Sequence, residues 1–224
     1  KTPSFSVSPD KQFYHCFGCG KGGGVINFIM DIENLSYPEA VEFLAKRANM
    51  PMPEETNDAE SRKRARMLAL NKDAARFFYE QLSTPLGESA REYIGKRQIR
   101  PATVKRFGLG AAPDDWSLLL NAMEKKGYTG QELFEAGLAR RGKNGGYYDT
   151  FRNRLMFPVI DVRGNVIGFS GRILGDGEPK YMNSPETIVF SKSHNLFALN
   201  LAKKSKCGYI ILAEGNIDVA SLHQ

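Results

Sequence analysis

The chain has 224 residues, of which 42% are hydrophobic and 25% are charged, a balance that excludes disordered and fibrous proteins and predicts one or two folded domains. No apolar run reaches the ~18 residues of a membrane-spanning helix, and the start, KTPSFSVSPDKQ, lacks the apolar stretch of a secretory signal, so we expect a cytoplasmic protein with no membrane partner. A formal net charge of +6 is compatible with a polyanionic partner, and three cysteines in a chain of this length exclude a disulfide framework.

The first predicted unit, residues 1–50, is a small module of strands and helices. Alternating apolar positions predict a β-hairpin over residues 5–16. Helical spacing of apolar residues over 25–32, and a capping box, SYPE, at 36–39, predict two short helices. A unit of ~50 residues has little core of its own, so we expect a metal ion to stabilise it.

Cys16 and Cys19 have the C-x2-C spacing that lets two thiolates bind one tetrahedral zinc ion. Gly20 follows directly and can adopt a positive φ, which lets backbone N–H groups point at the sulfur atoms. The alternative is a pair of buried or redox-active thiols. Structural zinc takes four ligands, and because no second pair follows, the other two are expected before Lys1. His15 neighbours Cys16 on a strand and points to the opposite face, so we expect it to pack rather than to bind metal.

Residues 51–61, PMPEETNDAES, have two prolines and no apolar period, which predicts a linker. A helix predicted over 61–82 opens the second domain, and short helices predicted between 91 and 135 follow it, with Trp116 expected in the core. Four basic residues crowd the start of the first helix: Arg62, Lys63, Arg64 and Arg66. They form either a solvated first turn or a nucleic-acid contact.

The segment RLMFPVIDVRGNVIGFSGRIL predicts a strand hairpin that turns at residues 163–165. A helix is expected near 195–204. After it, YIILA at 209–213 predicts a buried strand of the parallel type, with Cys207 in the core at its start. A helix from residue 216 completes the pattern, and the predicted fold class is mixed α+β.

Glu214 ends this predicted strand and passes through Gly215 into the last helix, which places it at the sheet edge where α/β folds bind ligands. Asp218 lies about one helical turn further on and is expected to face the same pocket. A carboxylate there can bind Mg²⁺ or transfer a proton. The alternative is an acid that complements the dipole at the helix start.

Basic residues punctuate the turns of the β-rich segment: Arg152, Arg154, Arg172, Lys180 and Lys192. Nearby glycines allow a ligand backbone to approach, which favours phosphate binding over idle surface positions. Tyr181 could stack on a base, although a place in the core is the simpler expectation for one tyrosine.

Taken in order, these segments resemble the bacterial-type DNA primases, which make short RNA primers on single-stranded DNA. KTPSFSVSPDKQFYHCFGCGKGGGVINFIM is similar to the second half of their zinc-binding domain, RNRLMFPVIDVRGNVIGFSGRIL and PKYMNSPET to the core of their polymerase domain, and LAEGNIDVASLHQ to the first motif of its TOPRIM fold. The resemblance implies a zinc-ribbon-like domain over 1–50, the linker over 51–61, the N-terminal part of an RNA polymerase domain over 62–206 and the start of a TOPRIM subdomain over 207–224.

The resemblance also implies roles for individual residues. Glu214 is the catalytic carboxylate and a ligand of catalytic Mg²⁺ or Mn²⁺, Asp218 is the second acid, and a Cys-x2-His pair before KTPSF completes the zinc site of Cys16 and Cys19. A basic groove for the template and for ribonucleoside triphosphates is implied at Arg97, Arg152, Arg154, Arg172, Lys180, Asn183 and Lys192. A replicative helicase is implied as a partner through a region nearer the C-terminus.

Two departures from the family pattern matter. The sequence EGNIDV at 214–219 stands where the family usually has EGYMDV, which removes an aromatic side chain. The family's Asp-x-Asp metal ligands fall beyond Gln224, and Lys1 stands in place of an initiator methionine. We therefore expect a natural chain that is longer at both ends, and a 224-residue stretch that is inactive alone.

Two other functions remain open from the sequence. One is a module that binds single-stranded DNA without catalysis. The other is a different TOPRIM enzyme, either a nuclease or a topoisomerase. A topoisomerase needs a tyrosine nucleophile on a separate domain, and no tyrosine in the sequence is set out in that way.

Overall fold

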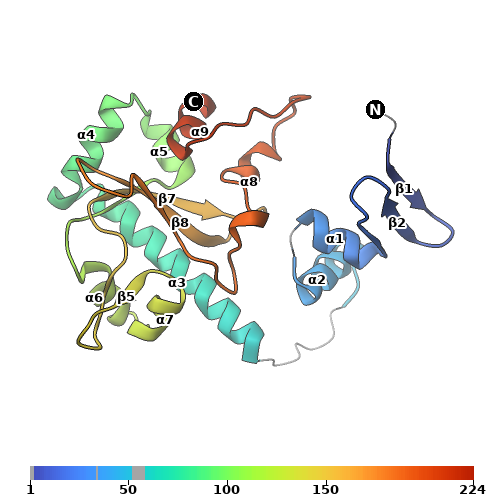
Figure 1. Cartoon of the computed structure of the whole chain (residues 1–224), viewed down its shortest axis with the longest axis horizontal. Helices are drawn as coiled ribbons and strands as arrows, with labels where there is room; N and C mark the ends of the chain where they lie inside the picture. The colour runs from blue at the N-terminus through green and yellow to red at the C-terminus, as the bar shows by residue number, and fades with distance from the viewer. Residues whose placement is uncertain (1–2, 34, 52–58) are drawn as a thin grey trace. The chain divides into compact units, whose positions relative to one another are not determined.

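The computed structural model describes residues 3–33, 35–51 and 59–224 and divides the chain into two compact units, residues 1–58 and 59–224 (Figure 1). Both units combine helices with antiparallel strands, in agreement with the predicted mixed α+β class. The division falls within the predicted linker, of which residues 52–58 lie outside the described residues. Residues 59–61, predicted as linker, instead begin a helix.

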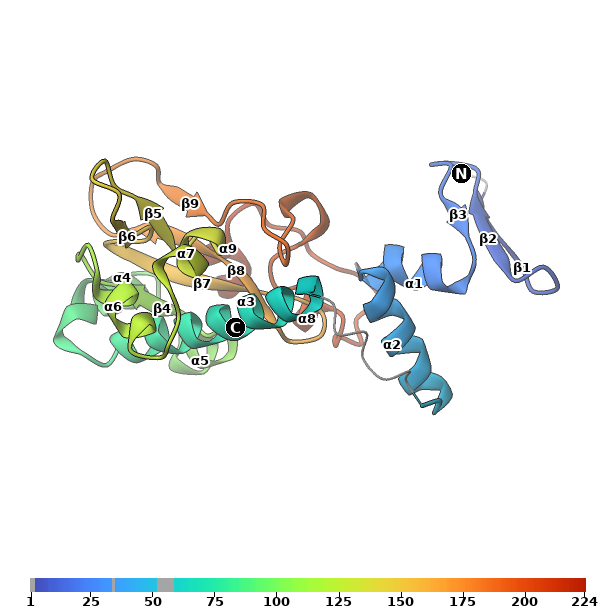
Figure 2. The ribbon, with the colours of Figure 1, turned by 90° about the horizontal axis from the view of Figure 1, so that it is seen from below.

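The first unit is a three-stranded antiparallel sheet followed by two helices. Its elements are β1 (Phe5–Ser8), β2 (Phe13–Cys16), β3 (Gly22–Gly23), α1 (Val25–Glu33) and α2 (Tyr37–Ala48). The strand order is β1-β2-β3 (Figure 2), and β1 pairs with β2 so that Phe5 lies opposite Cys16. The predicted hairpin and both predicted helices are therefore confirmed.

An aromatic cluster joins the sheet of this unit to α1. The rings of Phe5 and Tyr14 stack with centroids 5.5 Å apart, and Phe28 of α1 meets Tyr14 edge-on at 5.2 Å. The Tyr14 hydroxyl donates a 2.6 Å hydrogen bond to Asp31 on α1. This bond raises the pKa of Tyr14 to about 12. Tyr14 of β2 thus holds α1 against the sheet through both a ring contact and a hydrogen bond.

The core of the first unit is small. Among its described residues, only Tyr14, Leu35 and Ala40 are buried. The predicted capping box adds local order, because the Glu39 carboxylate accepts hydrogen bonds from the backbone N–H and the hydroxyl of Ser36, at 2.8 and 2.7 Å. So few buried side chains are consistent with a unit whose stability depends on a bound metal ion.

The second unit packs a four-stranded antiparallel sheet against a long helix. Its helices are α3 (Ala59–Gln81), η1 (Pro85–Gly87), α4 (Glu88–Lys96), α5 (Pro101–Phe107), α6 (Leu118–Glu124), α7 (Gly130–Glu135), η2 (Lys192–His194), α8 (Leu199–Ala202) and α9 (Asn216–His223). Its strands are β4 (Gly110–Ala112), β5 (Ala139–Arg141), β6 (Tyr147–Asp149), β7 (Arg154–Ile160), β8 (Val166–Ile173) and β9 (Tyr181–Asn183). The sheet order is β4-β7-β8-β9, while β5 and β6 form a separate hairpin.

Helix α3 runs along one face of this sheet (Figures 1 and 2) and contacts β4 and β8. The helix predicted over 61–82 is confirmed as α3, and its apolar face is buried at Leu70, Ala74 and Phe78. Phe78 meets Phe169 of β8 edge-on with ring centroids 5.5 Å apart. Position 110 on β4 requires glycine, because a Cβ there would lie 2.6 Å from the backbone of Phe78.

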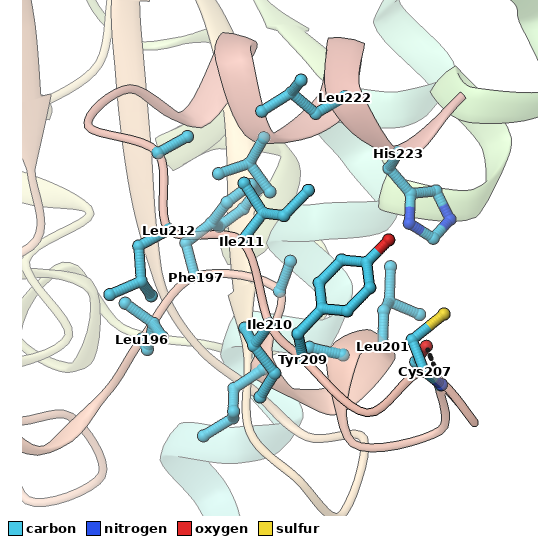
Figure 3. Close-up of a pocket in the computed structure, with 16 residues that line it drawn as sticks. Leu196, Phe197, Leu201, Cys207, Tyr209, Ile210, Ile211, Leu212, Leu222 and His223 are labelled. Atoms are coloured by element: carbon cyan, nitrogen blue, oxygen red, sulfur yellow. Dashed lines mark hydrogen bonds between the residues drawn. The ribbon is translucent and has the colours of Figure 1, made fainter.

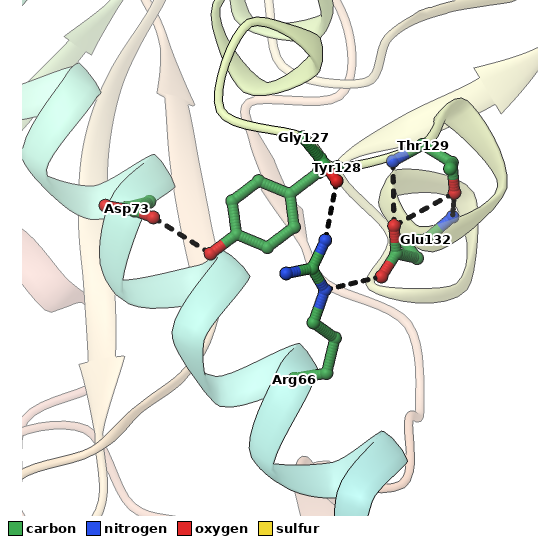
Figure 4. Close-up of polar contacts among 6 residues, drawn as sticks. All are labelled: Arg66, Asp73, Gly127, Tyr128, Thr129 and Glu132. Atoms are coloured by element: carbon green, nitrogen blue, oxygen red, sulfur yellow. Dashed lines mark hydrogen bonds and ion pairs between the residues drawn. The ribbon is translucent and has the colours of Figure 1, made fainter.

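The basic start of α3 is tied to its own unit. The Arg66 guanidinium donates to Glu132 of α7 at 2.8 Å and to the Gly127 carbonyl at 2.6 Å, and it lies 4.2 Å from the centroid of the Tyr128 ring (Figure 4). The Arg66 ion pair and hydrogen bonds from Thr129 hold the pKa of Glu132 below its usual value. Lys63 pairs with Glu135 at 2.8 Å.

Two further contacts complete this attachment of α3. Arg64 donates to the Ile188 carbonyl. Asp73, about two turns after Arg66 on the same face of α3, accepts hydrogen bonds from Tyr128 and Lys126 at 2.9 and 2.7 Å. These contacts favour a structural role for the basic start of α3 over the nucleic-acid contact that the sequence left open.

The β7–β8 hairpin turns where the sequence predicted. The Asp161 carboxylate accepts hydrogen bonds from the backbone N–H groups of Arg163 and Asn165, at 2.9 and 2.8 Å. Gly164 has φ +93°, a conformation that favours glycine. The hairpin is therefore specified by its own turn residues.

The predictions for the segment after η2 are partly wrong. The single helix expected over 195–204 is reduced to α8, because Ala198 has φ +63° and interrupts a continuous helix. No strand forms at 209–213, because a strand needs a hydrogen-bonding neighbour and none of the described strands lies beside this segment. Cys207, expected in the core, is exposed for the same reason.

The side chains at 209–212 line an apolar groove of about 290 Å³ instead (Figure 3). Tyr209 and Leu212 are 70% and 75% exposed, and Phe197 and Leu201 form part of the opposite wall. The helix predicted after this segment is confirmed as α9. Within the described ranges, no helix has the length and apolar character needed to cross a lipid bilayer.

Candidate nucleic-acid and metal sites

Cys16 ends β2, and Cys19 lies in the tight turn that leads to β3. The Cys16 N–H donates to the Lys21 carbonyl at 2.7 Å, and the Gly20 N–H donates to the Cys16 carbonyl at 2.8 Å. Gly20 has φ +74°, which confirms the predicted positive φ at this position. The turn therefore has the compact backbone that a two-thiolate metal knuckle requires.

Backbone N–H groups of Cys19 and Gly18, together with the Ser4 hydroxyl 3.7 Å from the Cys16 sulfur, lower the pKa of Cys16 to about 7. The thiolate is the form that binds zinc, so these two residues fit half of a zinc site. In the described part of the chain, no group of three or more His, Cys, Asp or Glu side chains lies close enough to hold a metal ion. A structural zinc ion at this knuckle would need two further ligands from outside the described residues.

His15 is not placed as a third ligand. Its ring is half-buried and meets Phe17 edge-on with centroids 4.7 Å apart. Its Nδ1 atom is buried and has no hydrogen-bond partner among the described residues. These contacts agree with the packing role that the strand alternation predicted.

Glu214 and Asp218 lie at the start of α9. Both side chains are exposed, and Gly215 between them is the N-cap of the helix. A Cβ atom at Gly215 would lie 2.6 Å from the Asp218 carboxylate and 3.8 Å from the Tyr181 hydroxyl, so Asp218 lies over Gly215 and beside Tyr181. Within the described residues no third metal-binding side chain joins these two acids.

A row of alternating arginine and tyrosine side chains approaches Asp218 from α4, β8 and β9. The Arg97 guanidinium donates to the Tyr93 hydroxyl at 3.1 Å. The Arg172 guanidinium lies between two rings, 5.1 Å from the centroid of Tyr93 and 5.4 Å from that of Tyr181. Contacts through Tyr93 and Tyr181 therefore connect Arg97 and Arg172 to the neighbourhood of Asp218.

Tyr181 is half-buried in this row, opposite Arg172 in the β8–β9 register. Burial raises its pKa, and the charge of nearby Asp218 acts in the same direction while Arg172 opposes it. The ring is thus only partly in the core, and its hydroxyl end reaches the start of α9.

Trp116 is not in the core, contrary to the prediction, because 63% of its surface is exposed. The Arg152 guanidinium lies 4.0 Å from the Trp116 ring centroid and 5.3 Å from that of Tyr148. We call Trp116, Tyr148 and Arg152 the aromatic shelf. The sequence held a signal for it, since Trp116 follows the turn-forming segment PDD at 113–115 rather than an apolar helix face.

Asp149 holds the aromatic shelf to α6. Its buried carboxylate accepts the N–H groups of Leu119 and Leu120 at 2.7 and 2.9 Å, and its own N–H donates to the Trp116 carbonyl at 2.8 Å. Burial raises the pKa of Asp149, and the two backbone hydrogen bonds oppose that effect. Arg152 donates to the Asp149 carbonyl, so one residue organises the start of α6 and both ends of the shelf.

Replacing Asp149 with Asn is expected to lower the free energy of unfolding by ~1–3 kcal/mol. The amide has one acceptor oxygen, so its NH₂ group would face a backbone N–H that the carboxylate now satisfies. Thermal and urea unfolding of the complete protein measure the change. Asp114→Asn, an exposed change beside the same turn, is the control and should stay within ~0.5 kcal/mol of the native protein; equal stability of the two variants would contradict the role of Asp149.

Arg154 differs from the expected groove contact. It is 3% exposed, and its guanidinium donates to the carbonyls of Gly171 and Pro179 at 2.9 and 3.0 Å. Burial, together with the charges of Arg152 and Arg140, lowers its pKa. In this structure Arg154 joins β7 to β8 and to the segment before β9, and no part of its guanidinium is presented to a phosphate.

The other predicted groove residues are on the surface. Lys180 directly precedes β9 and Asn183 is its last residue, and both are exposed. Lys192 in η2 is exposed, and its backbone N–H donates to Glu186 at 2.9 Å. Sequence reasoning missed Arg140 on β5, an exposed cation whose guanidinium lies 3.7 Å from the sulfur of Met182.

Two known protein families match different parts of the chain. Residues 77–203 match the family described as DNA primase catalytic core, N-terminal domain. Residues 1–60 match the CHC2 zinc finger family, which supports Zn²⁺ as the ion of the cysteine knuckle. Both matches agree with the resemblance noted in the sequence.

Curated relatives include the DNA primase of Clostridium acetobutylicum, 48% identical over 228 residues, and that of Escherichia coli, 41% identical over 230 residues. Each alignment covers 100% of this chain but only 38% and 40% of the relatives, so the chain spans about two-fifths of their length.

Solved structures of primases are also similar to this chain. The DnaG primase catalytic domain bound to ssDNA is 36% identical, with a TM-score of 0.69 over 73% of this chain and 53% of that one. The Aquifex aeolicus primase, with zinc-binding and RNA polymerase domains, is 35% identical, with a TM-score of 0.64 over 100% of this chain and 54% of that one. The second comparison extends over both units of the chain.

Proposed function

The chain belongs to the DNA primase family, and from that premise we propose that the complete protein makes short RNA primers on single-stranded DNA by metal-dependent nucleotidyl transfer. One observation carries the proposal: a series of contacts runs from Arg97 through Tyr93, Arg172 and Tyr181 to Asp218, four residues after the predicted catalytic Glu214. Cations for phosphate groups and carboxylates for metal ions are the two requirements of phosphoryl transfer.

Glu214 and Asp218 are the proposed acids of the catalytic centre, where residues 207–224 begin a TOPRIM subdomain. They would hold Mg²⁺ or Mn²⁺ together with further carboxylates of the complete protein, because hard cations need several oxygen ligands. A divalent ion there would activate the primer 3′ hydroxyl and neutralise the pyrophosphate. Gly215 leaves room for the Asp218 carboxylate at this point, because a Cβ there would lie 2.6 Å from it and the carboxylate would have to move.

The basic surface has two proposed parts. Arg97 and Arg172 would bind phosphate groups of the ribonucleoside triphosphate or template, with Lys180, Asn183 and Lys192 along the same path. The aromatic shelf would stack on a template base. We also propose that the zinc-finger unit contacts the template, and that a replicative helicase binds through another region of the complete protein.

The test is template-dependent synthesis by the complete protein. Single-stranded DNA, the four ribonucleoside triphosphates and Mg²⁺ should yield short ribonucleotide products whose sequence follows the template. Tight binding of the same DNA without any product would instead support the non-catalytic binding module.

Replacing Trp116 with Ala is expected to weaken binding of single-stranded DNA by ~5–100-fold, the effect of losing one base stack. The slope of log affinity against log salt should not change, because no phosphate contact is removed. Fluorescence anisotropy at several salt concentrations measures both quantities. Tyr79→Ala, which removes an exposed aromatic ring on α3 outside the shelf, is the control. Unchanged affinity of Trp116→Ala would remove the shelf from the proposed path.

A further inference from the structure

Tyr93 lies between the two arginines of the proposed groove. It is half-buried on α4, accepts the 3.1 Å hydrogen bond from Arg97 Nε, and has the Arg172 guanidinium 5.1 Å from its ring centroid. The Arg97 guanidinium lies 5.4 Å from the same centroid. One side chain therefore contacts both cations, although Arg97 and Arg172 come from distant parts of the sequence.

Neither arginine has an acidic partner. In the described part of the chain, Arg97 and Arg172 make no ion pair with any carboxylate, and Arg172 Nε is buried without a hydrogen-bond acceptor. Two guanidinium groups around one ring repel each other, and a buried donor without a partner is costly. Such an arrangement is favourable in the free protein only to the extent that the ring offsets the repulsion.

The Arg66 cluster at the start of α3 shows what a purely structural arrangement looks like in the same unit. There a guanidinium also lies over a tyrosine ring, 4.2 Å from the centroid of Tyr128, but it pairs with Glu132 and donates to the Gly127 carbonyl (Figure 4). Its charge and donors are satisfied within the protein. The Tyr93 cluster has the cations and the ring without the anion, so its missing component is a negatively charged ligand.

The chemistry of Tyr93 suits it to complete such a site. Its hydroxyl accepts from Arg97, which leaves the phenol hydrogen as a further donor. Its π-face stabilises cations without neutralising them, unlike a carboxylate, which would compete with an incoming anion. Holding two long side chains in place in advance also reduces the entropy lost when a ligand binds.

We propose that Tyr93 is a positioning residue that holds Arg97 and Arg172 as a pre-formed pair of cations for one phosphate group. The inference rests on the proposed function, in which these arginines bind the nucleotide or the template. It goes beyond that function because an uncharged residue, Tyr93, is given the role of holding the two guanidinium groups in position. Tyr181 closes the far side of Arg172 and leaves Tyr93 as the link between the arginines.

The experiment compares Tyr93→Phe and Tyr93→Leu in the complete protein, with ATP as the varied nucleotide in extension of an RNA primer on a thymidine template. Losing one hydrogen bond in Tyr93→Phe should raise the KM for ATP, or the Kd for single-stranded thymidine oligonucleotide, ~2–10-fold with kcat nearly unchanged. Tyr93→Leu, which also removes the ring, should have the larger effect. A rise in KM assigns the phosphate to the nucleotide, and a rise in Kd assigns it to the template.

A merely structural role would lower the melting temperature and leave KM and Kd unchanged, and that result would overturn the inference. Tyr128→Phe, which removes the hydrogen bond to Asp73 in the Arg66 cluster, is the matched control and should leave both constants unchanged. The variants Arg97→Ala and Arg172→Ala distinguish a failure of the inference on Tyr93 from a failure of the proposed function. If they raise KM or Kd while both Tyr93 variants do not, Tyr93 is not a positioning residue and the proposed function stands; if they too have no effect, the groove itself is misassigned.

Discussion

Replacing Glu214 with Gln in the complete protein is expected to lower the rate of primer synthesis by ~10²–10⁴-fold while single-stranded DNA binding changes less than about twofold. The amide keeps the size of the side chain but removes the negative charge that a divalent cation needs. Glu214 is exposed and makes no hydrogen bond or ion pair with the described residues, so the change should not disturb the fold. Initial rates of ribonucleotide incorporation at saturating nucleotide, over a range of Mg²⁺ concentrations, measure the effect.

Glu124→Gln is the matched control for this measurement, because Glu124 is an exposed acid on α6 at a distance in sequence from the proposed centre. It should retain the native rate. If Glu214→Gln also retained the native rate, catalysis at this carboxylate would be excluded. The module that binds single-stranded DNA without catalysis would then be the better account of the basic groove.

Replacing Cys16 or Cys19 with Ser is expected to remove zinc from the complete protein and to abolish the cooperative unfolding of the first unit. A hydroxyl is a far weaker zinc ligand than a thiolate, and structural zinc supplies much of the folding free energy of small modules. The few buried side chains of this unit cannot replace that contribution. Metal analysis gives the zinc content, and hydrogen exchange of residues 3–51 reports whether the unit stays folded.

Cys207→Ser is the control, since Cys207 is exposed and lies in the second unit. It should keep its zinc and its exchange protection. The second unit should melt at the same temperature in all three variants, because its core is built from its own helices and sheet. Full zinc content in Cys16→Ser would show that the knuckle is not the metal site.

Elements whose residues specify them locally were predicted well. The hairpin of the first unit, the β7–β8 turn at Asp161 and the helix that became α3 follow from side-chain periodicity and turn chemistry over a few residues. The Gly20 conformation belongs to the same class, since the cysteine knuckle itself demands it. Such features need no knowledge of distant parts of the chain.

Features that depend on distant residues were not predictable in this way. The segment at 209–213 has the composition of a buried strand but no strand beside it, so its apolar side chains line a groove. Trp116 is held outside the core by Asp149 and Arg152, which lie more than 30 residues away. In the candidate site, Arg172 was predicted from the basic residues of the β-rich segment and Arg97 from the family resemblance. The role of Tyr93 depends on α4 meeting β8 and has no signature in either segment alone.

The ion pairs at the start of α3 affect where the positive charge of this basic protein is available to a polyanion. Glu132 and Glu135 offset the charges of Arg66 and Lys63. These ion pairs weaken the electrostatic attraction between the start of α3 and an RNA or DNA duplex. Arg97 and Arg172, for which the described residues provide no carboxylate partner, keep their positive charge at the end of α4 and on β8. The positive charge of this chain, +6 in all, is therefore offset by carboxylates at the start of α3 and not at these two arginines.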